Sequence, residues 1–183
     1  AHKRPSSFAL KVPSGSTIGR RSSFGATPKS SKSRTRSMTS TSYEAIAADD
    51  FASLNQHLAA GTDVDLKDAK WGNTPLIHAS YHGRQKMIDR LVRHGANLDA
   101  QSNNGWTALH VAVGQEHHEV VGQLLRAGVK ASMRNRLFGQ GENQEQVSDT
   151  PLDLAINFDL PEITKLLRKH GAQTNAELKV KGQ

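Results

Sequence analysis

Three stretches of this 183-residue chain repeat one pattern, and their spacing limits the possible folds more than any other feature. Residues 73–79, 106–112 and 149–155 align, each with a Thr at its second position followed by Pro or Ala and then Leu. The first two of these Thr residues are 33 positions apart, and in all three stretches a Gly follows the Thr after 21 residues. A period of about 33, built from two short apolar segments and a turn, predicts a solenoid of stacked helix pairs.

The ends of the predicted helices have local explanations. Thr74 and Thr150 can cap a helix whose first position is Pro75 or Pro151, where the missing N–H costs nothing. A Gly stands just past the second apolar segment of each repeat, where a helix commonly ends in a left-handed residue that Gly adopts without penalty. These glycines are Gly95, Gly128 and Gly171.

The motif Thr-Pro-Leu-x-x-Ala, a second apolar run and Leu-x-x-Gly-Ala resembles the ankyrin repeat, in register over roughly residues 41–173. The resemblance implies an all-α solenoid of about four helix-turn-helix repeats with hairpin fingers, preceded by an extended basic tail. It also implies that the chain acts as a protein-interaction module. The expected divisions are a tail at 1–42, a repeat domain at 43–175 and a C-terminal tail at 176–183. The expected repeats are 43–69, 70–102, 103–135 and 146–175, with an inserted loop at 136–147.

One position in the turn between paired helices differs among the repeats. Gly83 in the second repeat is replaced by Glu116 in the third and Asp159 in the fourth. If the turn needs a positive φ, Glu116 costs on the order of 1 kcal/mol relative to Gly.

The charge of the chain is divided unevenly. Residues 1–43 hold nine Lys and Arg and no Asp or Glu, whereas the rest holds 15 Lys and Arg against 17 acidic residues. The basic character therefore belongs to the tail. The chain has no Cys, which excludes disulfides and thiolate metal sites.

The tail, polar and rich in Ser, is expected to be disordered when alone. Three interpretations remain open: a solvated linker, a polybasic arm for an acidic protein surface, or a targeting peptide. The basic residues expected to matter for an arm are Arg20, Arg21, Arg34 and Arg36. Two basic-basic-x-Ser sequences give candidate phosphorylation sites at Ser6, Ser7, Ser22 and Ser23, where a phosphate would add about −1.5 to −2 charges.

We find no sequence support for catalysis. No phosphate-binding Gly-rich motif and no nucleophile elbow is present, so the chain is not expected to be an enzyme or to need a cofactor. His117 and His118 are adjacent and would point in different directions at a helix start, unlike the i, i+4 pair that binds zinc. No metal site is predicted.

The candidate partner-binding residues occupy finger tips, the ends of first helices and the inserted loop. Aromatic residues are the strongest signal, because Trp and Tyr are enriched at binding hot spots. Packing against a neighbouring finger is the alternative for each. The candidates are Trp71, Tyr81, His82, Trp106, Gln115, Arg134, Leu137, Phe138, Asn157 and Phe158.

We therefore expect a non-catalytic interaction module, an accessory or scaffold subunit of a larger assembly, with the tail on an acidic surface. Its expected place is cytoplasmic or cytoskeletal, including a cilium or microtubule; nucleic acid binding and membrane insertion are not expected. The alternative is an organelle-targeted or nuclear regulatory protein whose tail is a targeting signal.

Overall fold

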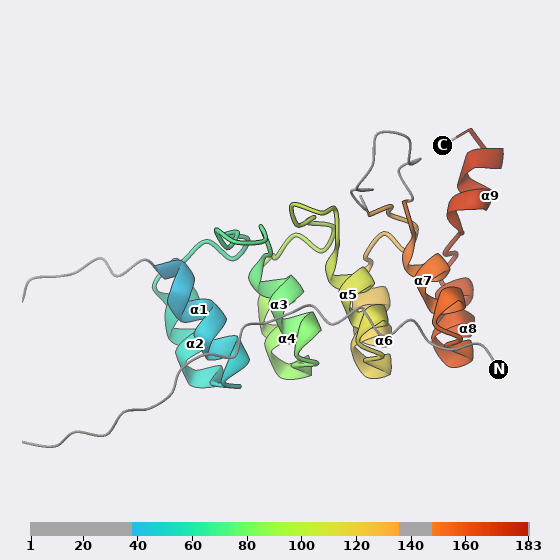
Figure 1. Cartoon of the computed structure of the whole chain (residues 1–183). Coiled ribbons are helices and arrows are strands. Elements are labelled where there is room, and N and C mark those ends of the chain that lie inside the picture. Colours follow the sequence, from blue (N-terminus) through green and yellow to red (C-terminus); the bar gives the residue numbers. More distant parts are fainter. Residues whose placement is uncertain (1–37, 136–147, 183) are drawn as a thin grey trace, which may run out of the picture. The chain divides into compact units, whose positions relative to one another are not determined.

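The computed structural model describes residues 38–135 and 148–182, and every regular element in these two ranges is an α-helix. Four helix pairs follow one another, and a short ninth helix closes the described part of the chain (Figure 1). The helices are α1 (Met38–Ala47), α2 (Phe51–Ala59), α3 (Pro75–Tyr81), α4 (Gln85–Arg93), α5 (Ala108–Gly114), α6 (His118–Ala127), α7 (Pro151–Asn157), α8 (Pro161–Lys169) and α9 (Asn175–Val180). The predicted all-α solenoid of about four repeats is confirmed.

The first helix of each later pair begins at the predicted Thr. The hydroxyls of Thr74, Thr107 and Thr150 each accept a hydrogen bond from the backbone N–H three residues on. Such caps satisfy one of the amides that a helix start leaves unpaired. Pro75 and Pro151 occupy first helical positions, as expected.

The helices form two rows. The first helices α1, α3, α5 and α7 contact one another in that order, and the second helices α2, α4, α6 and α8 do the same (Figure 1). Their apolar faces meet in one continuous core, in which Leu76, Leu91, Leu109, Leu124 and Leu152 are fully buried. Long connecting segments, the fingers, run from each second helix to the next first helix. Each finger is numbered by the repeat that it leads into, so the second runs from α2 to α3, the third from α4 to α5 and the fourth from α6 to α7.

The turn inside each pair requires a left-handed residue. The φ angle is 59° at Asp49, 66° at Gly83, 59° at Glu116 and 55° at Asp159. The turn thus does need a positive φ, the condition on which the expected cost at Glu116 depended, and three of the four turns carry a strained non-Gly residue. Gly95, Gly128 and Gly171 after the second helices also have positive φ, as predicted.

Two boundaries differ from those expected. Helix α1 begins at Met38, so the division drawn after residue 42 lies inside a helix. Residues 176–183, expected as a tail, include most of α9, whose start is fixed by a capping box between Thr174 and Glu177 and whose Leu178 is buried. The loop 136–147 and residues 1–37 lie outside the described residues. No helix in the described ranges has the length and apolar character to span a membrane.

Candidate interaction surface

Neighbouring fingers are tied together by a hydrogen bond that recurs with the repeat. In each case an oxygen of one finger's side chain accepts from a backbone N–H of the next finger, at 2.8–2.9 Å for the shortest contact. The acceptor and donor pairs are Asp65 with Asn97, Asp99 with Lys130, and Ser132 with Gln173. These bonds fix the spacing of the fingers, so side chains near the tips are held at defined separations.

The second finger is organised by the Asp68 carboxylate. Its Oδ1 accepts from the Trp71 amide at 2.6 Å, and its Oδ2 lies 3.0 Å from the His78 Nε2 and 3.1 Å from the Asn73 amide. Burial alone would raise the pKa of Asp68, but these hydrogen bonds hold it below its usual value. Sequence reasoning missed Asp68, although an Asp two to three residues before a turn is a known turn signal.

Tyr43 on α1 braces the same finger from the preceding repeat. Its hydroxyl donates to the carbonyl oxygens of Leu66 and, at 3.0 Å, Asn73, and its ring lies 4.5 Å from that of His78. Burial, together with the carboxylates of Asp68 and Asp63, raises the pKa of Tyr43. The base of the second finger is thus a fixed polar cluster.

The backbone of Trp71 is held by one hydrogen bond at its N–H and another at its carbonyl oxygen. Its N–H is bonded to Asp68, and its carbonyl oxygen accepts from the Asn103 amide of the next finger at 2.9 Å. The residue is 43% exposed, and the Lys70 ammonium lies 5.4 Å from the ring centroid. An exposed Trp on a rigid backbone can make a large contact area at little cost in ordering.

The side chain of Trp106 is placed differently from that of Trp71. Its ring is partly buried against the core, 5.9 Å from the His110 ring, and a Cβ added at Gly114 would touch it at 3.7 Å. The cause is position: Trp106 directly precedes Thr107, whereas Trp71 stands three residues before Thr74. The counterpart of Trp106 in the second repeat is therefore Asn73, and the indole of Trp106 packs along the helix of its own repeat.

His110, beside Trp106, is fully buried and completes a capping box. Its Nδ1 accepts from the Thr107 amide at 3.3 Å, and its Nε2 lies 3.1 Å from the Asp149 carbonyl oxygen. Burial lowers the pKa of His110 to about 4. The side chain is therefore a neutral structural group.

The remaining predicted residues near the first helices lie where these helices end. Tyr81 and Asn157 are the last residues of α3 and α7, and His82, Gln115 and Phe158 follow α3, α5 and α7 directly. Tyr81 and Phe158 pack partly against the core, whereas Asn157 is exposed. Burial is the main cause that lowers the pKa of His82, and the proximity of His78, Arg84 and His117 lowers it further.

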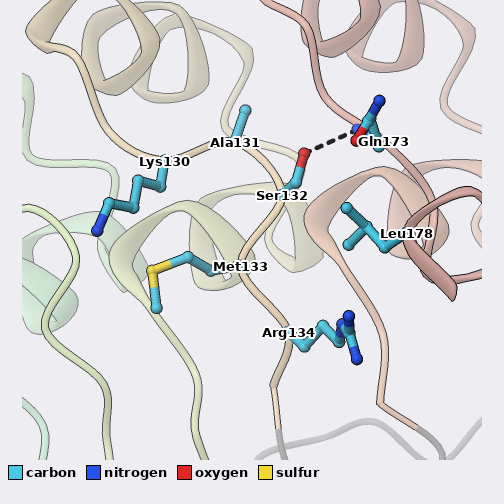
Figure 2. A pocket seen from close by; sticks show the side chains of 7 residues that line it. All are labelled: Lys130, Ala131, Ser132, Met133, Arg134, Gln173 and Leu178. Carbon is cyan, nitrogen blue, oxygen red and sulfur yellow. Dashed lines mark hydrogen bonds between the residues drawn. The ribbon is translucent and has the colours of Figure 1, made fainter. Parts of the chain in front are cut away.

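Arg134 lines an open hollow between the fourth finger, which follows α6, and α9 (Figure 2). The other lining residues are Lys130, Ala131, Ser132, Met133, Gln173 and Leu178. The predicted contacts Leu137 and Phe138 lie outside the described residues, as do the tail arginines and the candidate phosphorylation sites.

The His117–His118 pair sits at the start of α6, as expected. His117 is its N-cap residue, and its Nε2 lies 3.0 Å from the Tyr81 carbonyl oxygen of the preceding repeat. Across the described ranges, no three His, Cys, Asp or Glu side chains are grouped to hold a metal ion.

Comparison with known proteins agrees with this architecture. A family model described as ankyrin repeats in three copies matches residues 43–135, and a single ankyrin repeat model matches residues 148–178. The chain is 40% identical over 78 residues to the B-cell lymphoma 3 protein homolog of Mus musculus, covering 43% of this chain and 17% of that protein. It is 33% identical over 128 residues to the ankyrin repeat protein nuc-2 of Neurospora crassa, covering 68% and 11%.

A solved structure gives the same result. The ankyrin repeat domain of Bcl-3, described as a member of the IkappaB protein family, matches with a TM-score of 0.60 and 31% identity, over 69% of this chain and 50% of that one. The chain spans less than a fifth of the length of each of the two curated relatives from Mus musculus and Neurospora crassa. Ankyrin repeats serve as protein–protein interaction modules. With family models matching more than half of its length, the chain belongs to the ankyrin repeat family.

Proposed function

We propose that this chain binds a protein partner across one surface, with Trp71 as the central anchor. This surface, called the finger surface below, consists of the exposed side chains of the second and third fingers and of the ends of α3, α5 and α7. Tyr81, Trp106 and Phe158 contribute the partly buried aromatic groups of the same surface. The mechanism is rigid display, because the recurring bonds between fingers fix their spacing before a partner arrives.

The observation that carries the proposal is the fixed and exposed state of Trp71. The hydrogen bonds to Asp68 and from Asn103 leave its backbone little freedom, yet the residue is 43% exposed to solvent. Trp residues of this kind are enriched at binding hot spots. Lys70 beside the ring adds a positive charge, which favours a partner that places an acidic group next to its apolar contact.

Quantitative capture from a native extract tests the proposal. The wild-type chain is compared with Trp71→Ala and with Phe51→Ala, whose side chain is 40% exposed at the start of the second-row helix α2. Proteins bound through the finger surface should lose about 30-fold or more in affinity on Trp71→Ala, the equivalent of a hot-spot loss of about 2 kcal/mol, and should be retained by Phe51→Ala. Equal depletion by both variants, or by neither, would refute the assignment.

The finer role that we propose is that of an accessory or scaffold subunit in a larger assembly, cytoskeletal or axonemal in type. The support is the division of charge, since a tail with nine cations and no acid suits an acidic protein surface. Tail binding should weaken steeply with salt, because exposed charges are screened within about 8 Å at physiological ionic strength. Partner affinity that is flat with salt, or unchanged when Arg20, Arg21, Arg34 and Arg36 are replaced by Ser, would count against this role.

A regulatory role in the nucleus or an organelle is the second candidate. It is favoured by the likeness to Bcl-3, which is described as a member of the IkappaB protein family. In this role the basic tail would act as a targeting signal. Imaging of the tagged protein with and without residues 1–37 separates the candidates. If the tail is a targeting signal, its removal changes where the protein is found in the cell. If the tail is a binding arm, its removal lowers the affinity for the partner.

A further inference from the structure

The fourth finger lies beside a helix, whereas the second finger lies beside another finger. The second is joined to the third, beyond the recurring bond, by the Asn103 amide, which donates to the Trp71 carbonyl oxygen at 2.9 Å. The segment after α8 donates to the fourth finger from the Gln173 amide to the Ser132 hydroxyl oxygen, and the next residue, Thr174, is already the N-cap of α9. The rest of the fourth finger therefore faces α9.

The hollow of Figure 2 lies between these two elements. Its volume is about 560 Å³, within the range of pockets that hold a small ligand or a few side chains of a partner. The apolar part of its lining comes from Ala131 and Met133 of the finger and from Leu178 of α9. Because a thioether side chain is flexible, Met133 can adapt to the shape of an apolar group that enters the hollow.

Both charged residues that line this hollow are cations. Lys130 and Arg134 stand at the two ends of the finger stretch 130–134, and their charged groups lie apart from each other in Figure 2. The Lys130 Nζ is 3.6 Å from an Asp99 carboxylate oxygen, but the Lys side chain is 75% exposed. Surface pairs of this kind contribute little to stability, so the ammonium can also serve a carboxylate of a partner.

A second hollow adjoins the first through Gln173, which lines both. Its charged lining residues are Arg168, Glu177 and Lys181, and Arg168 is paired with Glu177. The two hollows together are thus lined by four cations and one carboxylate. The chain from residue 44 onward holds 15 Lys and Arg against 17 acidic residues, so the hollows are a local concentration of positive charge in a slightly acidic part of the chain.

We propose that the hollow between the fourth finger and α9 binds an acidic peptide segment of a partner protein. An aliphatic side chain of the peptide contacts Met133 and Leu178, and carboxylates beside it face Lys130 and Arg134. A small inorganic anion would meet one of the two separated cations, whereas a peptide reaches both and also covers the apolar lining. This surface is separate from the finger surface and does not depend on the function proposed above.

A nuclear magnetic resonance titration of the full chain tests the surface. The probe is the peptide Gly-Ser-Asp-Glu-Leu-Asp-Glu-Ser-Gly, and the backbone amide signals of Ala131, Ser132 and Gln173 should shift as it binds. The same peptide with Asn and Gln in place of Asp and Glu should bind about tenfold more weakly, because its charges are lost. The acidic peptide with Ser in place of Leu should bind about fivefold more weakly, because its apolar contact is lost.

Two matched double variants locate the binding. Lys130→Gln combined with Arg134→Gln should lower the affinity for the acidic peptide about fivefold or more, since two charge pairs are lost. Lys165→Gln combined with Lys169→Gln makes the same change of charge at exposed positions of α8 that line neither hollow. This control should lower the affinity less than about twofold.

Three results would overturn the proposal. The first is a titration in which the signals of Ala131, Ser132 and Gln173 do not move, whether or not signals of the basic tail or the finger surface do. The second is an equal loss of affinity in the two double variants, because binding would then follow the overall charge. The third is a chain that sediments as a dimer and whose three signals shift with its own concentration, because a second copy would then occupy the hollow.

Discussion

The second and third repeats have matching helices but place their distinctive residues differently. The second has Ile77, Gly83 and a Trp three residues before its cap; the third has His110, Glu116 and a Trp directly before its cap. The second repeat therefore has a relaxed turn and an exposed indole, while the third has a strained turn and an indole packed on its own helix. The comparison teaches that position within the repeat, more than residue type, decides whether an aromatic side chain stabilises the fold or faces a partner.

The largest expected effect is one that the two repeats share. Leu91 and Leu124 are equivalent, and both are fully buried. Leu91→Ala and Leu124→Ala should each lower the free energy of unfolding by about 2–5 kcal/mol. Urea denaturation measures both. Losses that differ by more than about 2 kcal/mol would mean that the two repeats do not contribute equivalent core.

The next effect is a pH dependence of the free energy of unfolding that comes from the third repeat, which has His110 where the second has Ile77. Because the pKa of His110 is lowered to about 4 in the folded state, the unfolded chain binds a proton first as the pH falls below about 6.5. Stability should therefore be full above pH 6.5 and fall by roughly 2–4 kcal/mol between pH 6.5 and 4.

His110→Gln, which keeps hydrogen-bonding groups but does not titrate, should remove most of this pH dependence. His82, whose pKa is also lowered, supplies the remainder in both proteins. Denaturation midpoints at pH 7 and pH 5 are the measurement. If the stability of the variant depends on pH as strongly as that of the wild type, His110 is not the cause of the pH dependence.

The smallest effect concerns the turns. Glu116 and Asp159 have φ values of 59° and 55°, so Glu116→Gly and Asp159→Gly should each raise the free energy of unfolding by about 1 kcal/mol. The reverse change, Gly83→Glu, should destabilise, since a Cβ there meets the His117 ring at 3.0 Å. Thermal melts of the three variants make the test, and a stabilising Gly83→Glu would contradict the strain argument.

Much of the fold follows from the sequence because its determinants are local. Thr caps, Pro at first helical positions and Gly after helices specify helix ends within a few residues, and the 33-residue period supplies the stacking. Helix α9 was not predicted, because it has only six residues and its capping box of Thr174 and Glu177 was not recognised.

The candidate surface was predicted less well. The aromatic residues were singled out from the sequence, but the offset between Trp71 and Trp106 relative to their caps was not used, so both were expected at finger tips. Asp68 was overlooked although its partners Trp71, Asn73 and His78 all lie within ten positions of it. Tyr43 escaped because its hydrogen bonds join residues as far as 30 positions apart. Such contacts depend on how repeats stack, which the periodicity alone does not resolve at the level of side chains.

The central claim is that Trp71 serves binding while Trp106 also serves stability, and paired measurements on Trp71→Ala and Trp106→Ala test it most directly. With a captured partner, Trp71→Ala should weaken binding by about 2 kcal/mol or more and change the free energy of unfolding by less than about 0.5 kcal/mol. Trp106→Ala should lower the free energy of unfolding by about 1–3 kcal/mol, since its ring is only partly buried. Equal stability losses in the two variants, or full partner affinity in Trp71→Ala, would contradict the account.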